Sequence, residues 1–167
     1  MPGTRAFLAR IESDWAQVRP DLNAAPMLSV LRLTRLGAAL QSHVDDLLRR
    51  ENLNAAGWDL LLTLYRSAPA EGLSPGQLSV LSAVSGPSTT NRILRLQRRG
   101  LITRAVDSRD RRAARVQLTP AGRTLVDRLL PEFLACEQEL LKALPAGQLT
   151  HLDALVDRLL ATLEPDG

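Results

Sequence analysis

The chain has little of what catalytic and metal centres are built from. It holds one cysteine, Cys136, and two histidines among its 167 residues. A lone cysteine cannot form an internal disulfide, and no CxxC or histidine partner stands at zinc-ligand spacing from it. Because it falls on a helical apolar stripe, Cys136 is expected to be a small buried hydrophobic residue. We expect no metal site and no cofactor.

Long hydrophobic runs and catalytic motifs are also missing. No stretch reaches the roughly 18 uninterrupted apolar residues of a membrane span, and the opening segment is too charged for a signal peptide. The sequence carries no HExxH, P-loop, GxSxG or GxGxxG motif. We therefore expect a cytoplasmic protein with no membrane partner, no catalytic residues and no enzymatic activity.

Aromatic residues make up 3% of the chain, and the abundance of leucine and alanine favours helices. Apolar residues at helical spacing predict helices over residues 4–18, 25–50, 54–67, 74–82, 86–99, 120–144 and 146–163. Two strand-length runs, 101–106 and 113–118, flank the polar segment DSRDRR and predict a β-hairpin. The expected fold is therefore mainly α with one small hairpin.

Two local signals mark helix ends in the middle of the chain. The run Ser74-Pro75-Gly76-Gln77 combines an N-cap hydroxyl, a proline suited to the first turn and a glutamine three residues on, which is a capping box. Gly100 is typical of a C-terminal helix stop. The two helices that these signals delimit are separated by a short turn, which gives the pair the proportions of a helix-turn-helix.

The second helix of this pair has two chemically different sides. Ile93 and Leu96 can face a core, while Ser88, Asn91, Arg92, Arg95 and Arg99 recur at the spacing of one exposed face. Small hydroxyls near the helix start allow close approach to phosphates, asparagine can read adenine and arginine can read guanine. We predict DNA contacts from Ser88, Thr89, Thr90, Asn91, Arg92 and Arg95. A merely solvated polar face is the alternative.

The net charge is only +3, so the placement of arginines matters more than their number. Five of them fall within twelve residues of the predicted hairpin: Arg104, Arg109, Arg111, Arg112 and Arg115. Guanidinium groups at a hairpin tip suit the negative potential of a minor groove. We predict DNA contacts from Arg109, Asp110, Arg111 and Arg112, with Asp110 holding a neighbouring arginine extended. A charged, solvated turn is the alternative.

These elements and two adjoining segments, Asp107-Ser-Arg-Asp-Arg-Arg112 and Val116-Gln-Leu-Thr-Pro-Ala-Gly122, resemble the MarR family of winged helix-turn-helix regulators. The resemblance implies that Arg112 enters the minor groove and that Asp110 orients it. It also implies a homodimer on a pseudopalindromic, double-stranded DNA operator. The corresponding division is 1–52 for N-terminal helices, 53–119 for the winged helix-turn-helix, and 120–167 for C-terminal helices, with both sets of terminal helices forming a dimerisation domain.

Further segments resemble the urate-responsive HucR subgroup of that family. They are Leu53 to Pro69, which reads LNAAGWDLLLTLYRSAP, Ser85 to Arg92, which reads SGPSTTNR, and the first helix with its SDWA run. The resemblance implies a small anionic effector, urate or a related purine, bound by Trp15, Asp59, Arg92 and Arg104. By the same resemblance, repulsion between the bound anion and Asp59 shifts the helix that carries Arg92, so that the regulator, a repressor by expectation, leaves the operator.

Several alternatives stay open at this stage. Trp15 can be a core anchor of its helix, Asp59 can be solvated, and Arg92 can contact phosphate alone. A histidine of the urate-responsive subgroup is replaced here by Gly37, so acid sensing tied to that histidine is not expected. A regulator of the same fold can respond to a phenolic, antibiotic or oxidant signal instead. A winged helix can also bind proteins without DNA specificity.

Overall fold

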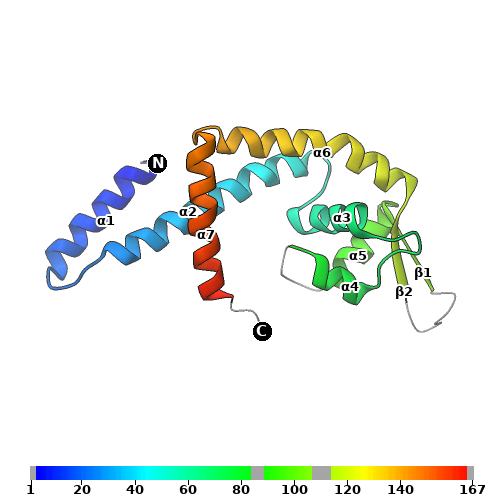
Figure 1. Ribbon diagram of the computed structural model, residues 1–167, viewed down its shortest axis with the longest axis horizontal. Coiled ribbons are helices and arrows are strands. Elements are labelled where there is room, and N and C mark those ends of the chain that lie inside the picture. The colour runs from blue at the N-terminus through cyan, green and yellow to red at the C-terminus, as the bar shows by residue number, and fades with distance from the viewer. Residues whose placement is uncertain (1–2, 84–88, 107–113, 165–167) are drawn as a thin grey trace. The chain divides into compact units, whose positions relative to one another are not determined.

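The computed structural model describes residues 3–83, 89–106 and 114–164 (Figure 1). The chain forms two compact units, Met1–Asp46 and Leu47–Gly167. Helices dominate both, and one two-stranded antiparallel sheet lies in the second unit. The expected mainly helical class with a small hairpin is confirmed. The predicted helix start at Gly86 lies outside the described residues.

The first unit consists of α1 (Thr4–Val18) and most of α2 (Ala25–Arg49), which ends in the second unit. Arg35 on α2 joins the two helices. Its Nε donates to Thr4 Oγ1 over 3.2 Å, and its guanidinium lies 4.7 Å from the centroid of the Phe7 ring. A cation over an aromatic face adds a modest electrostatic attraction, so this contact contributes to the pairing of α1 with α2.

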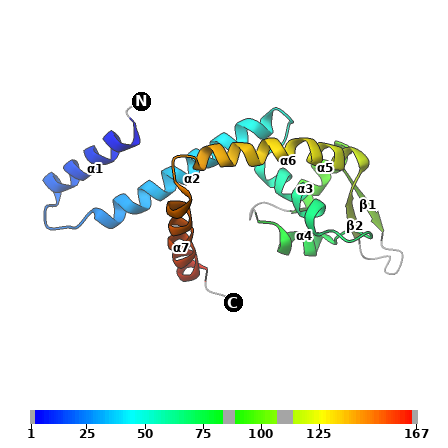
Figure 2. The ribbon, with the colours of Figure 1, turned by 45° about the horizontal axis from the view of Figure 1, so that its top comes forward.

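The second unit gathers α3 (Ala55–Ser67), α4 (Pro75–Leu81) and α5 (Thr89–Arg98) beside the hairpin of β1 (Ile102–Val106) and β2 (Ala114–Leu118) (Figures 1 and 2). The hairpin register pairs Ile102 with Leu118 and Val106 with Ala114. A further bridge joins Leu73 to Val116 through two backbone hydrogen bonds. The short helix pair is therefore packed against a small sheet, as in a winged helix.

Two long helices complete the second unit, α6 (Pro120–Leu141) and α7 (Ala146–Leu163). Helix α6 ends at Leu141, three residues before the predicted end, because the chain turns there through a hydrogen bond from Leu144 N to Leu141 O. Cys136 on α6 is half-buried, so its expected burial is wrong for the single chain. Helix α7 is completely described, and none of its residues is buried.

The core of the second unit lies between α3, α5, the hairpin and the first half of α6. Its fully buried apolar side chains are Leu48, Trp58, Leu60, Leu61, Leu78, Ile93, Leu96, Ile102, Val116, Val126 and Leu129. Trp58 on α3 packs against Phe133 on α6, with ring centroids 5.6 Å apart. Burial of these side chains is the main stabilising term for the unit.

The local helix signals are confirmed. Ser74 Oγ accepts from Gln77 N, and Gln77 Oε1 accepts from Ser74 N, so the predicted capping box is present. Gly100 has φ +69° and closes α5 through hydrogen bonds from Gly100 N to Gln97 O and from Leu101 N to Leu96 O. This pair of bonds is a Schellman motif, in which glycine takes the left-handed position without strain.

A two-pronged ion pair attaches α6 to the turn that follows α2. Arg128 on α6 places Nη1 2.9 Å from Glu51 Oε1 and Nη2 2.8 Å from Glu51 Oε2. Hydrogen bonding from Arg128 is the largest influence on Glu51 and lowers the pKa of its carboxyl group. Both side chains are partly exposed, 53% for Arg128 and 26% for Glu51, so solvent screens the pair.

Glu51→Gln tests the pH dependence of this pair. A carboxyl group whose pKa is lowered by folding contributes stability above its unfolded-state pKa and loses it as pH falls through the folded-state pKa. We expect the variant to unfold more easily than the wild type near neutral pH and equally easily in acid. Chemical denaturation across acidic and neutral pH measures this, and a difference that persists in acid contradicts the assignment.

Gly122→Ala tests the contact between α6 and the end of α5. A Cβ at Gly122 would overlap the carbonyl oxygen of Leu101, a backbone atom that cannot move away cheaply. We expect the free energy of unfolding to fall by about 1–3 kcal/mol, measured by denaturant titration. Gly147→Ala on α7 is the matched control, because its Cβ would meet nothing within 4 Å in the chain. Equal effects of the two changes would contradict the close contact.

Candidate nucleic-acid interface

Helix α5 presents a polar face because its apolar residues are fixed in the core. Ile93 and Leu96 are each 2% exposed, while Asn91 and Arg95 are exposed and Arg92 is half-buried. Thr90 is exposed and Thr89 is half-buried at the start of the described helix. The predicted division of α5 into an inner and an outer side is therefore confirmed, whereas the DNA contacts assigned to the outer side stay predictions.

Some residues predicted to contact DNA lie outside the described residues. They are Ser88, before α5, and Arg109, Asp110, Arg111 and Arg112, between β1 and β2. The strands on either side of the second group are in register up to the pair Val106 and Ala114. Arg104 on β1 is exposed, and Arg115 on β2 is half-buried, with its Nη1 3.4 Å from Gln77 Oε1.

A cavity of about 220 Å³ lies between the start of α3 and the outer side of α5. Its lining consists of Leu53, Asn54, Ala56, Gly57, Asn91, Arg92, Arg95 and Leu96. The start of α3 is shaped by Asn54, whose Oδ1 accepts from Gly57 N over 3.0 Å. The cavity thus places two arginines and two asparagines around one concave surface, an arrangement that suits an anionic group such as a phosphate.

The four predicted effector residues occupy separate elements. Asp59 on α3 is 6% exposed, and its Oδ1 accepts from Ala83 N over 3.2 Å. Arg92, on α5, lines the cavity between α3 and α5. Neither Asp59 nor Arg104 is among the described residues that line it. Trp15 lies on α1 in the first unit, with 36% of its surface exposed. Asp59 is buried, so the alternative that it is merely solvated is wrong.

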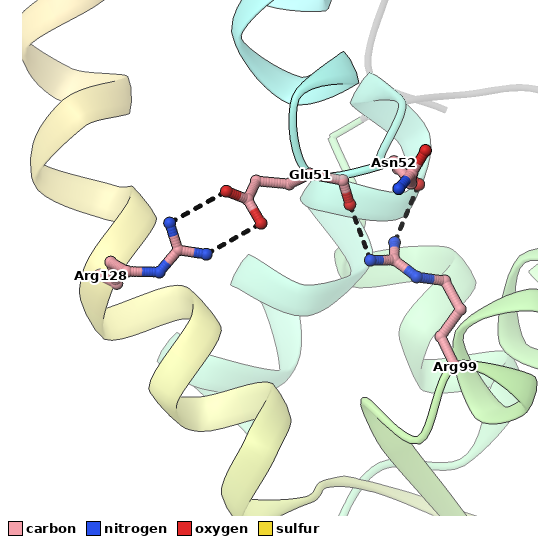
Figure 3. A network of polar contacts seen from close by, with 4 residues as sticks. All are labelled: Glu51, Asn52, Arg99 and Arg128. Carbon is pink, nitrogen blue, oxygen red and sulfur yellow. Dashed lines mark hydrogen bonds and ion pairs between the residues drawn. The ribbon is translucent and has the colours of Figure 1, made fainter.

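The sequence pattern did not reveal the partners of Arg99. The residue is exposed, as the pattern of α5 predicts, but its guanidinium bonds to the turn after α2 (Figure 3). Nη1 donates to Asn52 O over 2.9 Å and Nη2 donates to Glu51 O over 2.7 Å. A sequence signal existed for the end of α2, where asparagine is suited to the left-handed position. No local signal linked that turn to an arginine 47 residues away.

Metal-ligand clusters and membrane-spanning helices are both absent from the described part of the chain. No group of three or more His, Cys, Asp and Glu side chains comes together there as a set of metal ligands. Within the same residue ranges, every helix is too short or too polar to cross a membrane. The concentration of polar and basic groups on the outer side of α5 therefore remains the principal candidate surface.

Comparison with known proteins places the chain in a family. A model of the MarR family matches residues 51–113, which run from the turn before α3 into the segment between the strands. The chain is 31% identical over 149 residues to the HTH-type transcriptional regulator PecS of Dickeya dadantii (strain 3937). That alignment covers 89% of this chain and 90% of PecS.

Solved structures share the fold. Sco3205, a MarR family transcriptional regulator from Streptomyces coelicolor solved in complex with DNA, matches with a TM-score of 0.76 at 21% identity, over 87% of this chain and 91% of its own. CouR from Rhodococcus jostii RHA1, solved bound to p-coumaroyl-CoA, matches with a TM-score of 0.64 at 22% identity, over 81% and 91%. These structures show the fold, and the relationship to PecS with the family model shows that the chain belongs to the MarR family of winged helix-turn-helix transcriptional regulators.

Proposed function

We propose that this regulator is a homodimeric repressor that binds a pseudopalindromic operator and leaves it when urate or a related purine anion binds. The observation that carries the DNA-binding part is the outer side of α5, where Asn91 and Arg95 are exposed while Ile93 and Leu96 anchor the helix. Asparagine and arginine are the side chains that pair most specifically with adenine and guanine in a major groove. Sco3205, which shares the fold, was solved in complex with DNA.

The hairpin supplies the second part of the proposed interface. Antiparallel pairing of β1 with β2 carries the chain toward the segment that holds Arg109, Arg111 and Arg112. Arginines on such a wing gain most in a narrow minor groove, where the negative potential is enhanced. In this proposal, α5 reads base edges and the wing arginines, oriented by Asp110, fix the register along the duplex.

The terminal helices support a dimer. Large apolar side chains that a soluble monomer rarely gathers are exposed along them: Met27, Val30, Leu33 and Leu36 on α2, Leu134 on α6, and Leu155, Val156, Leu159, Leu160 and Leu163 on α7. A second copy of the chain can cover these stripes, because exposed hydrophobic patches commonly mark subunit interfaces. Two-fold symmetry would then present two copies of α5 to one duplex, about one helical turn apart.

Asp59 connects the proposed effector to DNA binding. Its buried carboxylate accepts a hydrogen bond from Ala83 N. Ala83 is the last described residue before α5. An anion that binds beside Asp59 would be repelled by it, and movement of Asp59 would pull on the segment before α5. Arg92 and Arg104 would pair the anion and Trp15 would cover its planar face. CouR, which shares this fold, was solved bound to p-coumaroyl-CoA.

Arg95→Gln and Arg112→Ala test the two parts of the interface. Each change removes a guanidinium that we place on the duplex, so each is expected to weaken operator binding by about 1–3 kcal/mol. Fluorescence anisotropy with a duplex that the wild-type protein selects from a random pool measures the affinity, and calorimetry with urate checks that effector binding is retained. Arg158→Gln on α7 is the matched loss of one charge. Unchanged affinity in both interface variants would refute the assignment.

Asp59→Asn tests the effector mechanism. The amide oxygen can still accept from Ala83 N, but the negative charge that repels the anion is gone. We expect the variant to bind urate and keep its DNA affinity, while the urate-induced loss of DNA affinity, typically about 5- to 150-fold for such coupling, becomes much smaller. Anisotropy with and without urate measures this.

Two results would contradict the effector mechanism. Full urate-induced release of Asp59→Asn would remove the charge-repulsion account. Calorimetric binding of a phenolic acid, together with no binding of urate by the wild-type protein, would instead favour a phenolic signal for the same fold. Testing both ligands on both proteins separates the mechanism from the identity of the effector.

A further inference from the structure

The end of α2 leaves two backbone carbonyl groups that its own helix cannot satisfy. Asn52 has φ +52°, and hydrogen bonds run from Leu53 N to Leu48 O and from Asn52 N to Arg49 O. This Schellman geometry turns the carbonyls of Glu51 and Asn52 away from the helix, at its negative end. A cation with two parallel donors is the group that such a pair of acceptors suits best.

Arg99 supplies that cation from the far end of α5. It follows Arg98, the last residue of the helix, and spans both carbonyls with Nη1 and Nη2 (Figure 3). Two of the five guanidinium donors therefore bond to the protein's own backbone at the surface, with N–O distances of 2.9 and 2.7 Å. A lysine ammonium is a point charge and does not reproduce this planar fork.

Glu51 then joins this contact to α6. Its backbone oxygen accepts from Arg99 while its carboxylate is held at both oxygens by Arg128, so one residue ties α5 to α6 (Figure 3). The two buried residues of α5, Ile93 and Leu96, are one turn apart and pack the helix against α3, α4 and β1. The hydrogen bonds of Arg99 add a separate restraint just after the last residue of the helix.

We propose that Glu51, Arg99 and Arg128 are positioning residues that set the orientation of α5 for DNA reading without touching the duplex themselves. The inference rests on the proposed role of α5 in DNA binding. Because α6 also carries the exposed Leu134, the junction is attached to a helix of the proposed dimer interface. A displacement of about 1 Å at a recognition element is enough to weaken a site that depends on geometry.

The test compares Glu51→Gln, Arg128→Gln and the double variant on the duplex selected by the wild-type protein, with anisotropy measured over a series of salt concentrations. Loss of the junction should raise Kd about tenfold in either single variant, and no further in the double variant. The two changes alter net charge in opposite directions. A long-range charge effect would therefore tighten binding by Glu51→Gln and weaken binding by Arg128→Gln, which would overturn the proposal.

Arg99→Lys separates positioning from phosphate contact. Lysine keeps the charge but loses the fork, so we expect about the same tenfold rise in Kd as for the other variants and an unchanged slope of log K against log salt. Arg99→Gln removes the charge as well as the fork, and a fall in that slope by about 0.9 for this variant would assign Arg99 to a phosphate instead. Arg98→Gln is the control for charge loss at the same helix end. Arg128→Lys keeps a charge beside Glu51 but loses the second prong, so we expect a Kd between those of the wild type and Arg128→Gln.

The same measurements distinguish this proposal from the proposed function. If the wild-type protein selects no duplex, or if Arg95→Gln binds as the wild type does, the assignment of α5 as the reading helix fails. If Arg95→Gln loses affinity while Glu51→Gln and Arg128→Gln retain it, DNA reading by α5 stands and the positioning junction is refuted. Melting temperatures and circular dichroism of every variant show that each Kd belongs to a folded protein.

Discussion

The burial of Ile93 and Leu96 in the core of the second unit is the interaction on which the candidate DNA interface of α5 depends. A helix as short as α5 is not stable in water by itself, since its nucleation cost exceeds what so few hydrogen bonds return. Burial of two large apolar side chains contributes roughly 1.5–3 kcal/mol each, and α3, α4 and β1 supply the contacting surface. With that side fixed inward, Asn91 and Arg95 are directed to solvent. The reading face is thus a consequence of the core.

Arginine has two different roles in this protein. Some arginines face solvent on α5 and β1, but others close helix ends inside the second unit. Arg99 holds the carbonyls after α2, and Arg66 on α3 donates to Leu81 O at the end of α4 over 2.9 Å. The planar, permanently charged guanidinium suits both tasks. A count of basic residues therefore overstates the DNA-facing charge, and each arginine has to be placed by its contacts.

The sequence predicts well those features that depend on residues close together in the chain. The capping box at Ser74, the glycine stop at Gly100 and the two sides of α5 all follow from spacings of three or four residues, and the structure contains each of them. The role of Arg99 was missed because its partners are set by the packing of α5 against the end of α2. The half-burial of Cys136 was missed because an apolar stripe on α6 does not reveal whether the chain itself covers it. The assembly of Trp15, Asp59, Arg92 and Arg104 into one effector site stays a prediction from family resemblance.

The exposed stripes of the terminal helices and the outer side of α5 are explained together by one arrangement, in which two copies of the chain place two reading helices on one duplex. Sedimentation velocity of the protein with the selected duplex tests this arrangement directly, because the mass of the complex gives its stoichiometry. We expect a dimer in the absence of DNA and two chains on each duplex. A monomer in solution, or one chain on a duplex at saturation, would contradict the account.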